Sequence, residues 1–162
     1  MFNGFQQHSG IATINSDENE NKKDDIIDSV LIIGDSMLNN IEGNGISNKG
    51  NVKLLPIPGA TSYDMKDHAN PIINRKPDIL ILHIGSNDLT KNVDNTIPNL
   101  QSIVGRCKKK SAYTKNAISS LITRKDIRNG ETEVIKLNDK LKAFCVENLI
   151  DFIKGSSSKQ KR

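Results

Sequence analysis

Short apolar runs alternate along the chain with segments in which apolar residues recur every three or four positions. Residues 30–33 form a continuous apolar run, which is typical of a strand buried on both faces of a sheet. Further runs that predict strands follow at residues 52–57, 78–84, 117–123 and 149–153. Strands that alternate with helices favour a parallel sheet covered on both faces. We therefore expect an α/β fold with five strands.

Helix signals lie between these runs. Thr61 is a good N-cap for a helix through Met65, which we expect Pro71 to interrupt or bend. Thr96 is placed to cap a later helix that has Pro98 in its first turn, where proline is tolerated. One side of that helix is apolar, with Ile97, Leu100, Ile103, Val104 and Cys107. The last predicted helix has apolar residues at helical spacing, at Val134, Leu137, Leu141, Phe144 and Cys145.

The length and composition suit one domain with polar ends. A chain of 162 residues leaves little room for a second domain. We expect a flexible polar leader at residues 1–28, the folded domain at residues 29–153, and a basic disordered tail at residues 154–162. The sequence shows no secretory signal and no apolar run of about 18 residues that would span a membrane. We therefore expect a cytoplasmic protein in which Cys107 and Cys145 are reduced and buried.

The net charge of +4 and the pI of about 9.0 hide an uneven distribution of charge. Acidic residues gather near the amino terminus, and basic residues gather at residues 106–115 and in the tail. Such patches would suit weak contact with a nucleic-acid backbone, here through Lys108, Lys109 and Lys110. A solvated helix end is the favoured interpretation, because tryptophan is absent and the chain is poor in aromatic residues that could stack bases.

The loop after the first predicted strand carries a candidate nucleophile. In a parallel sheet, functional loops gather at the carboxyl ends of the strands. Gly-Asp-Ser occupies residues 34–36, where the glycine permits a sharp turn and Ser36 would open a helix. A serine at a helix N-terminus is well placed as a nucleophile, although the same tripeptide also occurs in ordinary turns and caps.

The next two loops carry candidate hydrogen-bond donors. Gly59 follows the second strand, where a glycine allows its N–H group to approach a substrate oxygen closely. After the third strand come Asn87, whose side chain could donate to an oxyanion, and Asp88, which could hold the loop in shape. Taken singly, a strand-ending turn and an Asx-turn explain these residues. The order Ser, Gly, Asn in three successive loops favours a functional interpretation.

In these three blocks the chain resembles the SGNH hydrolase family, also called GDSL-type esterases. The resemblance covers nearly the whole predicted domain and is most specific in the Gly-Ser-Asn-Asp sequence of the third loop. It implies a flavodoxin-like, three-layer, doubly wound fold whose five-stranded parallel sheet has the order 2-1-3-4-5. It also implies that Ser36 attacks an ester carbonyl, and that its own N–H, that of Gly59 and the side chain of Asn87 stabilise the oxyanion. The residues that would support these loops are Asp35 and Asp88.

One block of the family pattern has no counterpart. The family's Asp-x-x-His block is missing after Ile153, so the resemblance implies a domain truncated at its C-terminus. His8 lies in the leader, His68 on a predicted helix surface and His83 within an apolar strand, so none of the three replaces the missing base convincingly. Residues 117–126 (AISSLITRKD) add a narrower resemblance, to the esterase-type domains of some retrotransposon-encoded proteins.

Three functions remain open at this point. The first, and the one favoured by the resemblance, is a serine esterase acting on a small ester, which the missing histidine would leave inactive in this chain. The second is a non-catalytic nucleic-acid-binding module of a mobile-element protein, with a vestigial ester pocket. The third is a fragment without activity. No cofactor and no metal site is expected.

Overall fold

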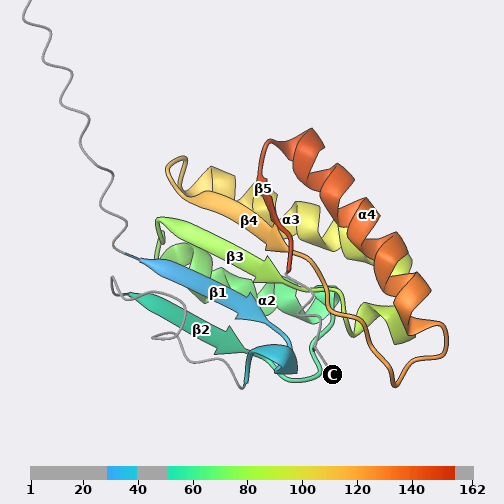
Figure 1. The fold of residues 1–162 in the computed structure, drawn as a ribbon. Helices are drawn as coiled ribbons and strands as arrows, with labels where there is room; N and C mark the ends of the chain where they lie inside the picture. Colours follow the sequence, from blue (N-terminus) through green and yellow to red (C-terminus); the bar gives the residue numbers. More distant parts are fainter. Residues whose placement is uncertain (1–28, 40–50, 156–162) are drawn as a thin grey trace, which may run out of the picture.

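The structure, a computed structural model, describes residues 29–39 and 51–155. A five-stranded parallel sheet of order β2-β1-β3-β4-β5 forms its centre (Figure 1). The strands are β1 (Val30–Gly34), β2 (Val52–Pro56), β3 (Ile79–His83), β4 (Lys115–Ser119) and β5 (Asp151–Ile153). Every neighbouring pair of strands is parallel. The predicted α/β class and strand order are therefore confirmed.

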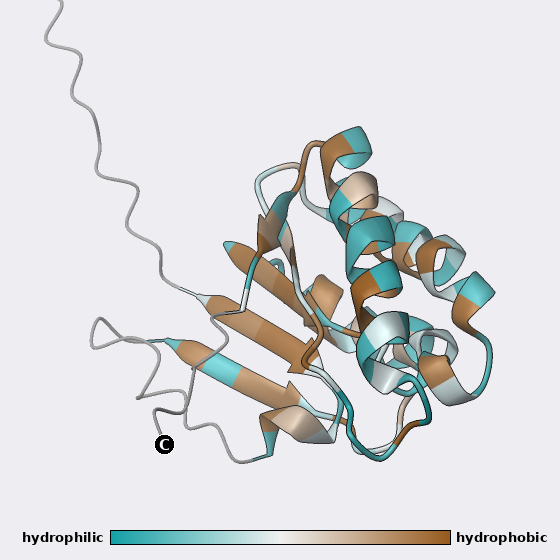
Figure 2. Ribbon diagram, turned by 45° about the vertical axis from the view of Figure 1, so that its right-hand side comes forward, coloured by the Kyte–Doolittle hydropathy of each residue, from teal (hydrophilic) through white to brown (hydrophobic). Residues whose placement is uncertain are grey.

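Three helices share one hydrophobic core with the sheet. They are α2 (Ser62–Asn74), α3 (Thr96–Lys110) and α4 (Gly130–Asn148). Ile33, Leu82 and Ile118 lie side by side in β1, β3 and β4, and all three are completely buried in that core. In Figure 2 the sheet is mostly brown, the colour of hydrophobic residues, with a hydrophilic band in the edge strand β2, which contains Lys53. Each buried aliphatic side chain contributes roughly 1.5–3 kcal/mol, so this packing stabilises the sheet, and the parallel pairing places the carboxyl ends of its strands along one edge.

Two helix starts show where local signals succeed and fail. The cap at Thr61 is confirmed, because its side chain accepts from the backbone N–H of Asp64, whose carboxylate accepts from the N–H of Thr61 at 2.9 Å. Of the predicted interruption or bend at Pro71, the interruption is wrong, since α2 continues past this exposed residue, where water can replace the missing hydrogen bond. Asn95, not Thr96, is the N-cap of α3. Thr96 is instead completely buried as the first helical residue.

The cysteines are as expected. Cys107 and Cys145 are both buried and free of a disulfide. Burial raises the pKa of both thiols, that of Cys145 to about 11. Neither sulfur is therefore a thiolate at neutral pH, and both act as apolar core residues.

Gly34→Ala is expected to destabilise the domain by about 2–3 kcal/mol. A Cβ atom at Gly34 would lie 2.7 Å from the backbone oxygen of His83 and 2.8 Å from the Leu38 side chain, so β1 and β3 would have to separate. Gly105→Ala is the matched control, because a Cβ there meets nothing within 4 Å and the helix gains about 0.5–1 kcal/mol. Urea unfolding of both variants measures the two effects. Equal stabilities would contradict this account of the β1–β3 contact.

Candidate active site

The turn after β1 exposes Ser36. Asp35 caps the short 3₁₀ helix Ser36–Leu38, and its carboxylate accepts a hydrogen bond from the N–H of Met37 at 2.9 Å. The Asp35 side chain is 2% exposed, whereas Ser36 is exposed on the outside of the turn. The buried aspartate therefore fixes the turn, and Ser36 is left exposed.

The turn after β2 is built around Gly59. Its φ of +75° lies in the left-handed region that favours glycine, and Pro58 precedes it, as in a type II turn. The N–H of Ala60 closes the turn by donating to the carbonyl of Ile57 at 3.2 Å. The N–H of Ile57 in turn donates to the carbonyl of Gly34 at 2.8 Å, which fastens this loop to the end of β1.

The turn after β3 fastens the third loop to the second. Asn87 donates from Nδ2 to the carbonyl of Ala60 at 2.9 Å. The carboxylate of Asp88, which is 3% exposed, accepts hydrogen bonds from the N–H (2.9 Å) and the hydroxyl of Ser62 at the start of α2. The loops that carry Ser36, Gly59 and Asn87 thus form one hydrogen-bonded cluster at the carboxyl edge of the sheet. This is the edge at which the sequence places them.

Neither described histidine is hydrogen-bonded to Ser36. His83 is 7% exposed, and its Nδ1 lies 2.6 Å from the hydroxyl of Ser119 on the neighbouring strand. Burial lowers the pKa of His83, and the nearby negative charge of Asp35 partly opposes that shift. His68 is exposed on α2, and His8 lies outside the described residues. His83 is therefore neutral at pH 7 and hydrogen-bonded to Ser119. This is the core histidine that its position in an apolar strand predicts.

The lowered pKa of His83 makes stability depend on pH. The pKa of His83 in the folded state lies below the unfolded value of about 6.5. The contribution of neutral His83 to the free energy of unfolding is therefore complete above about pH 6.5, and it falls as the pH decreases towards the folded pKa. The expected slope is at most about 1.4 kcal/mol per pH unit. Urea unfolding between pH 5 and 8 measures the free energy of unfolding at each pH. This free energy should fall more steeply with decreasing pH in the wild type than in His83→Gln. Identical slopes would mean that His83 titrates normally.

The sequence interpretation missed Arg124. It assigned residues 117–123 to a strand, but β4 ends at Ser119 and the chain then turns towards the candidate site. Arg124 donates from Nη1 to the side-chain oxygen of Asn87 at 3.2 Å, and from Nε to Asp126 at 3.0 Å. A polar residue soon after the fourth strand was the available signal, because that loop shares the edge with the other three.

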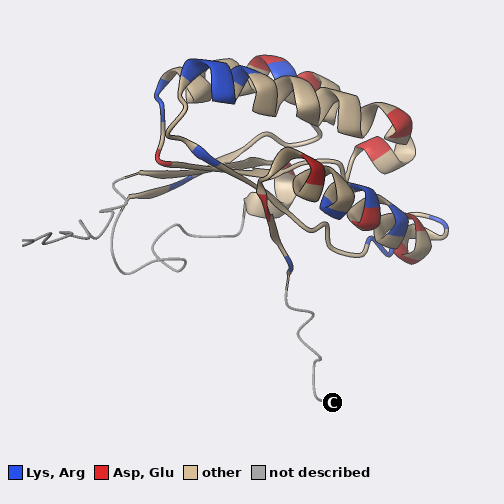
Figure 3. Cartoon of the chain, turned by 90° about the horizontal axis from the view of Figure 1, so that it is seen from above, with Lys and Arg blue, Asp and Glu red and all other residues tan. Residues whose placement is uncertain are grey.

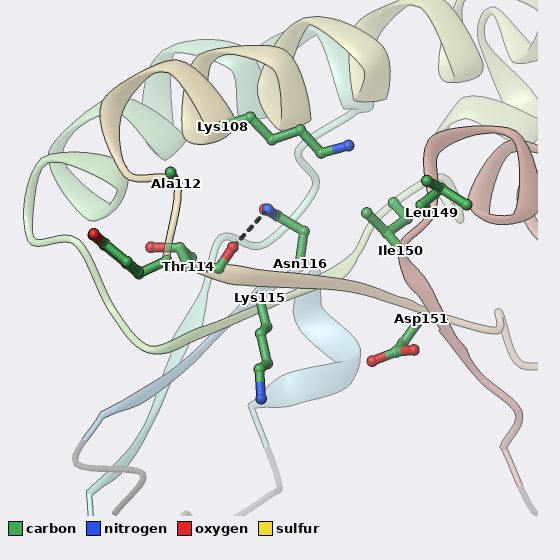
Figure 4. Close-up of a pocket in the computed structure, with 9 residues that line it drawn as sticks. Lys108, Ala112, Thr114, Lys115, Asn116, Leu149, Ile150 and Asp151 are labelled. Carbon is green, nitrogen blue, oxygen red and sulfur yellow. Dashed lines mark hydrogen bonds between the residues drawn. The ribbon is translucent and has the colours of Figure 1, made fainter. Parts of the chain in front are cut away.

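The lysine cluster lies away from this cluster of loops. Lys108, Lys109 and Lys110 form the last turn of α3, which runs antiparallel to the strands and ends at their amino edge (Figure 3). Lys108 donates to the carbonyl of Asn148 at 2.7 Å and borders a hollow of about 630 Å³ between α3, β4 and the start of β5 (Figure 4). The basic patch and the candidate active site are thus separate surfaces.

The described residues contain no group of three or more His, Cys, Asp or Glu side chains that could hold a metal ion. They also contain no helix with the length and apolar character needed to cross a membrane.

Comparison with solved structures identifies the fold. No protein-family model and no curated protein matches the sequence. A protein from Desulfitobacterium hafniense assigned to the lipolytic G-D-S-L family matches with a TM-score of 0.66 and 15% identity, over 78% of this chain and 76% of that chain. Acetylxylan esterase from Geobacillus stearothermophilus matches with a TM-score of 0.61 and 18% identity, over 77% of this chain and 74% of that one.

A third solved structure is matched over a smaller share of its own length. A protein from Streptococcus pneumoniae named for platelet activating factor matches with a TM-score of 0.65 and 14% identity, over 78% of this chain. The present chain spans 65% of that protein's length. These matches agree with the sheet order and the parallel pairing described above. The chain therefore has the α/β fold of the SGNH, or GDSL-type, esterases.

Proposed function

We propose that this chain is an ester-hydrolase domain with Ser36 as its nucleophile. The observation that carries the proposal is the cluster of three loops, in which hydrogen bonds from Ile57, Asn87 and Ser62 fasten each loop to its neighbour. The solved structures with this fold include an acetylxylan esterase and a carbohydrate acetylesterase, which supports ester chemistry at this edge.

The proposed reaction is acyl transfer through a covalent intermediate. The Ser36 oxygen attacks the ester carbonyl carbon, while the serine proton passes to a base and then to the departing alcohol. The N–H groups of Ser36 and Gly59 and the amide of Asn87 stabilise the oxyanion. Water then releases the acid and restores Ser36. A small ester is the proposed substrate, because the exposed Ser36 and Gly59 are open to such a molecule.

The base is the missing part of this scheme. Within the described part of the chain, His83 is held by Ser119 and His68 lies on an exposed helix surface. Serine without an adjacent base is a weak nucleophile at neutral pH. We therefore expect slow acylation of Ser36 by the protein alone, and faster acylation when free imidazole is added as a base.

Hydrolysis of a short-chain aryl ester tests the proposal. The full chain should hydrolyse the ester faster than Ser36→Ala does, and imidazole should increase the difference between them. The matched control is Ser102→Ala, an exposed serine on α3 that should behave as wild type. Equal rates for wild type and Ser36→Ala, with and without imidazole, would reject Ser36 as a nucleophile.

A further inference from the structure

The loop after β4 brings the guanidinium group of Arg124 to the loop after β3, which carries Asn87. Arg124 donates from Nη1 to the side-chain oxygen of Asn87 at 3.2 Å and to the backbone oxygen of Ser86 at 3.4 Å. Its other edge faces Asp126, with an Nε–Oδ1 distance of 3.0 Å and a second contact from Nη2. Arg124 thus bridges a carboxylate of its own loop and the amide of a candidate catalytic residue.

The backbone of this loop is held in place at both ends. The side chain of Asn138 on α4 accepts from the N–H of Leu121 at 2.7 Å and donates to its carbonyl at 3.0 Å. At the other end, a Cβ on Gly130 would lie 2.1 Å from the backbone oxygen of Arg124, so α4 can begin this close to the loop only with glycine. Contacts with α4 therefore hold the backbone of Arg124, and the salt bridge of its side chain to Asp126 lies near the surface.

The amide of Asn87 has two chemically different ends, and each has a matching partner. Its oxygen accepts from Arg124, and its nitrogen donates one hydrogen to the carbonyl of Ala60. A flipped amide would place its NH₂ group against a guanidinium and its oxygen against a carbonyl, which are two repulsive contacts. In the observed orientation one amide hydrogen remains available to a ligand.

We propose that Arg124 is a positioning residue that holds the Asn87 amide with its free hydrogen available to the oxyanion. This inference rests on the proposed function for its catalytic consequence, but the orientation of the amide can be measured without catalysis. Asp126 keeps the fork of Arg124 turned towards Asn87. Lysine at this position would keep the charge but could not bind Asp126 and Asn87 through a planar fork.

A double-mutant cycle tests whether Arg124 acts through Asn87. The measured rate is acylation of Ser36 by the aryl ester in imidazole. Arg124→Gln should lower it about tenfold in the wild-type background, since small misplacements of catalytic groups cost such factors, and less than twofold in the Asn87→Ala background. Arg124→Lys should recover little of the loss. Arg128→Gln, an exposed arginine near the same loop, is the matched control. Equal losses in both backgrounds would overturn the proposal.

NMR separates failure of this inference from failure of the proposed function. The side-chain ¹H–¹⁵N signals of Asn87, assigned by their loss in Asn87→Asp, report its hydrogen bonds directly. They should shift in Arg124→Gln and stay in place in Arg128→Gln, with both variants folded. If Ser36 proves unreactive but these signals shift, the positioning contact stands and the esterase proposal fails. Unchanged signals in Arg124→Gln would refute the positioning role whatever the activity.

Discussion

Asn87→Ala is expected to slow acylation of Ser36 by about 10²–10³-fold, because it removes one donor that the proposed mechanism places on the oxyanion. The amide lies in a preformed position, held by Ala60 on one side and Arg124 on the other, so little reorganisation is needed when negative charge develops. Ground-state binding of the ester should change much less, since a neutral carbonyl oxygen gains less from the donor. Single-turnover kinetics with the aryl ester separates the two effects.

The isosteric variant Asn87→Asp sharpens this test. It keeps the shape of the side chain but replaces the amide hydrogens with a carboxylate, which repels an oxyanion, so it should be at least as slow as Asn87→Ala. Asn92→Ala, an exposed asparagine beyond the loop, should react like wild type. A rate loss confined to substrate affinity would indicate that Asn87 binds the ester without stabilising its transition state.

Asp88→Ala is expected to lower the free energy of unfolding by about 2–4 kcal/mol. The buried carboxylate receives both the N–H and the hydroxyl of Ser62, and Asn99 donates to that same hydroxyl at 2.9 Å. Its removal leaves these donors unpaired in a buried site and removes a negative charge from the N-terminus of α2. Urea unfolding at neutral pH measures the loss.

Asp94→Ala serves as the control for this prediction. The Asp94 side chain is 87% exposed, and its ion pair with Lys140 is 4.0 Å long, so its loss should change stability by less than about 0.5 kcal/mol. If Asp88→Ala and Asp94→Ala proved equally stable, the hydrogen bonds between Asp88 and Ser62 would not stabilise the domain as stated.

The parallel sheet and the three candidate loops were predictable from short-range patterns, whereas the strand order followed from the family resemblance. Continuous apolar segments such as residues 30–33 can be satisfied only by burial on a sheet, and the loops that follow them must then share one edge. Pro58 followed by Gly59 is typical of a tight turn, and Thr61 with Asp64 three residues later is typical of the capping box that begins α2. In these places local preference and overall fold agree.

The contacts that orient the site were not predictable, because they join residues far apart in the chain. Leu121 and its neighbours look like a strand by composition, yet the side chain of Asn138 on α4 takes the place of a neighbouring strand. That replacement ends β4 early and allows Arg124 to reach Asn87. Thr96 was likewise mistaken for the cap of α3. Its complete burial in the core, which the local sequence does not show, places it inside the helix.

The central claim is that Ser36 is the nucleophile of an ester-hydrolase site, and a fluorophosphonate probe tests it most directly. The full chain, Ser36→Ala and Ser119→Ala would be treated in imidazole, and the modified residue would be identified by peptide mass spectrometry. Ser119 is included because its hydroxyl lies 2.6 Å from Nδ1 of His83. The account predicts a single adduct on Ser36, lost in Ser36→Ala and retained in Ser119→Ala. A folded protein that forms no adduct, or forms it on Ser119, would contradict the account.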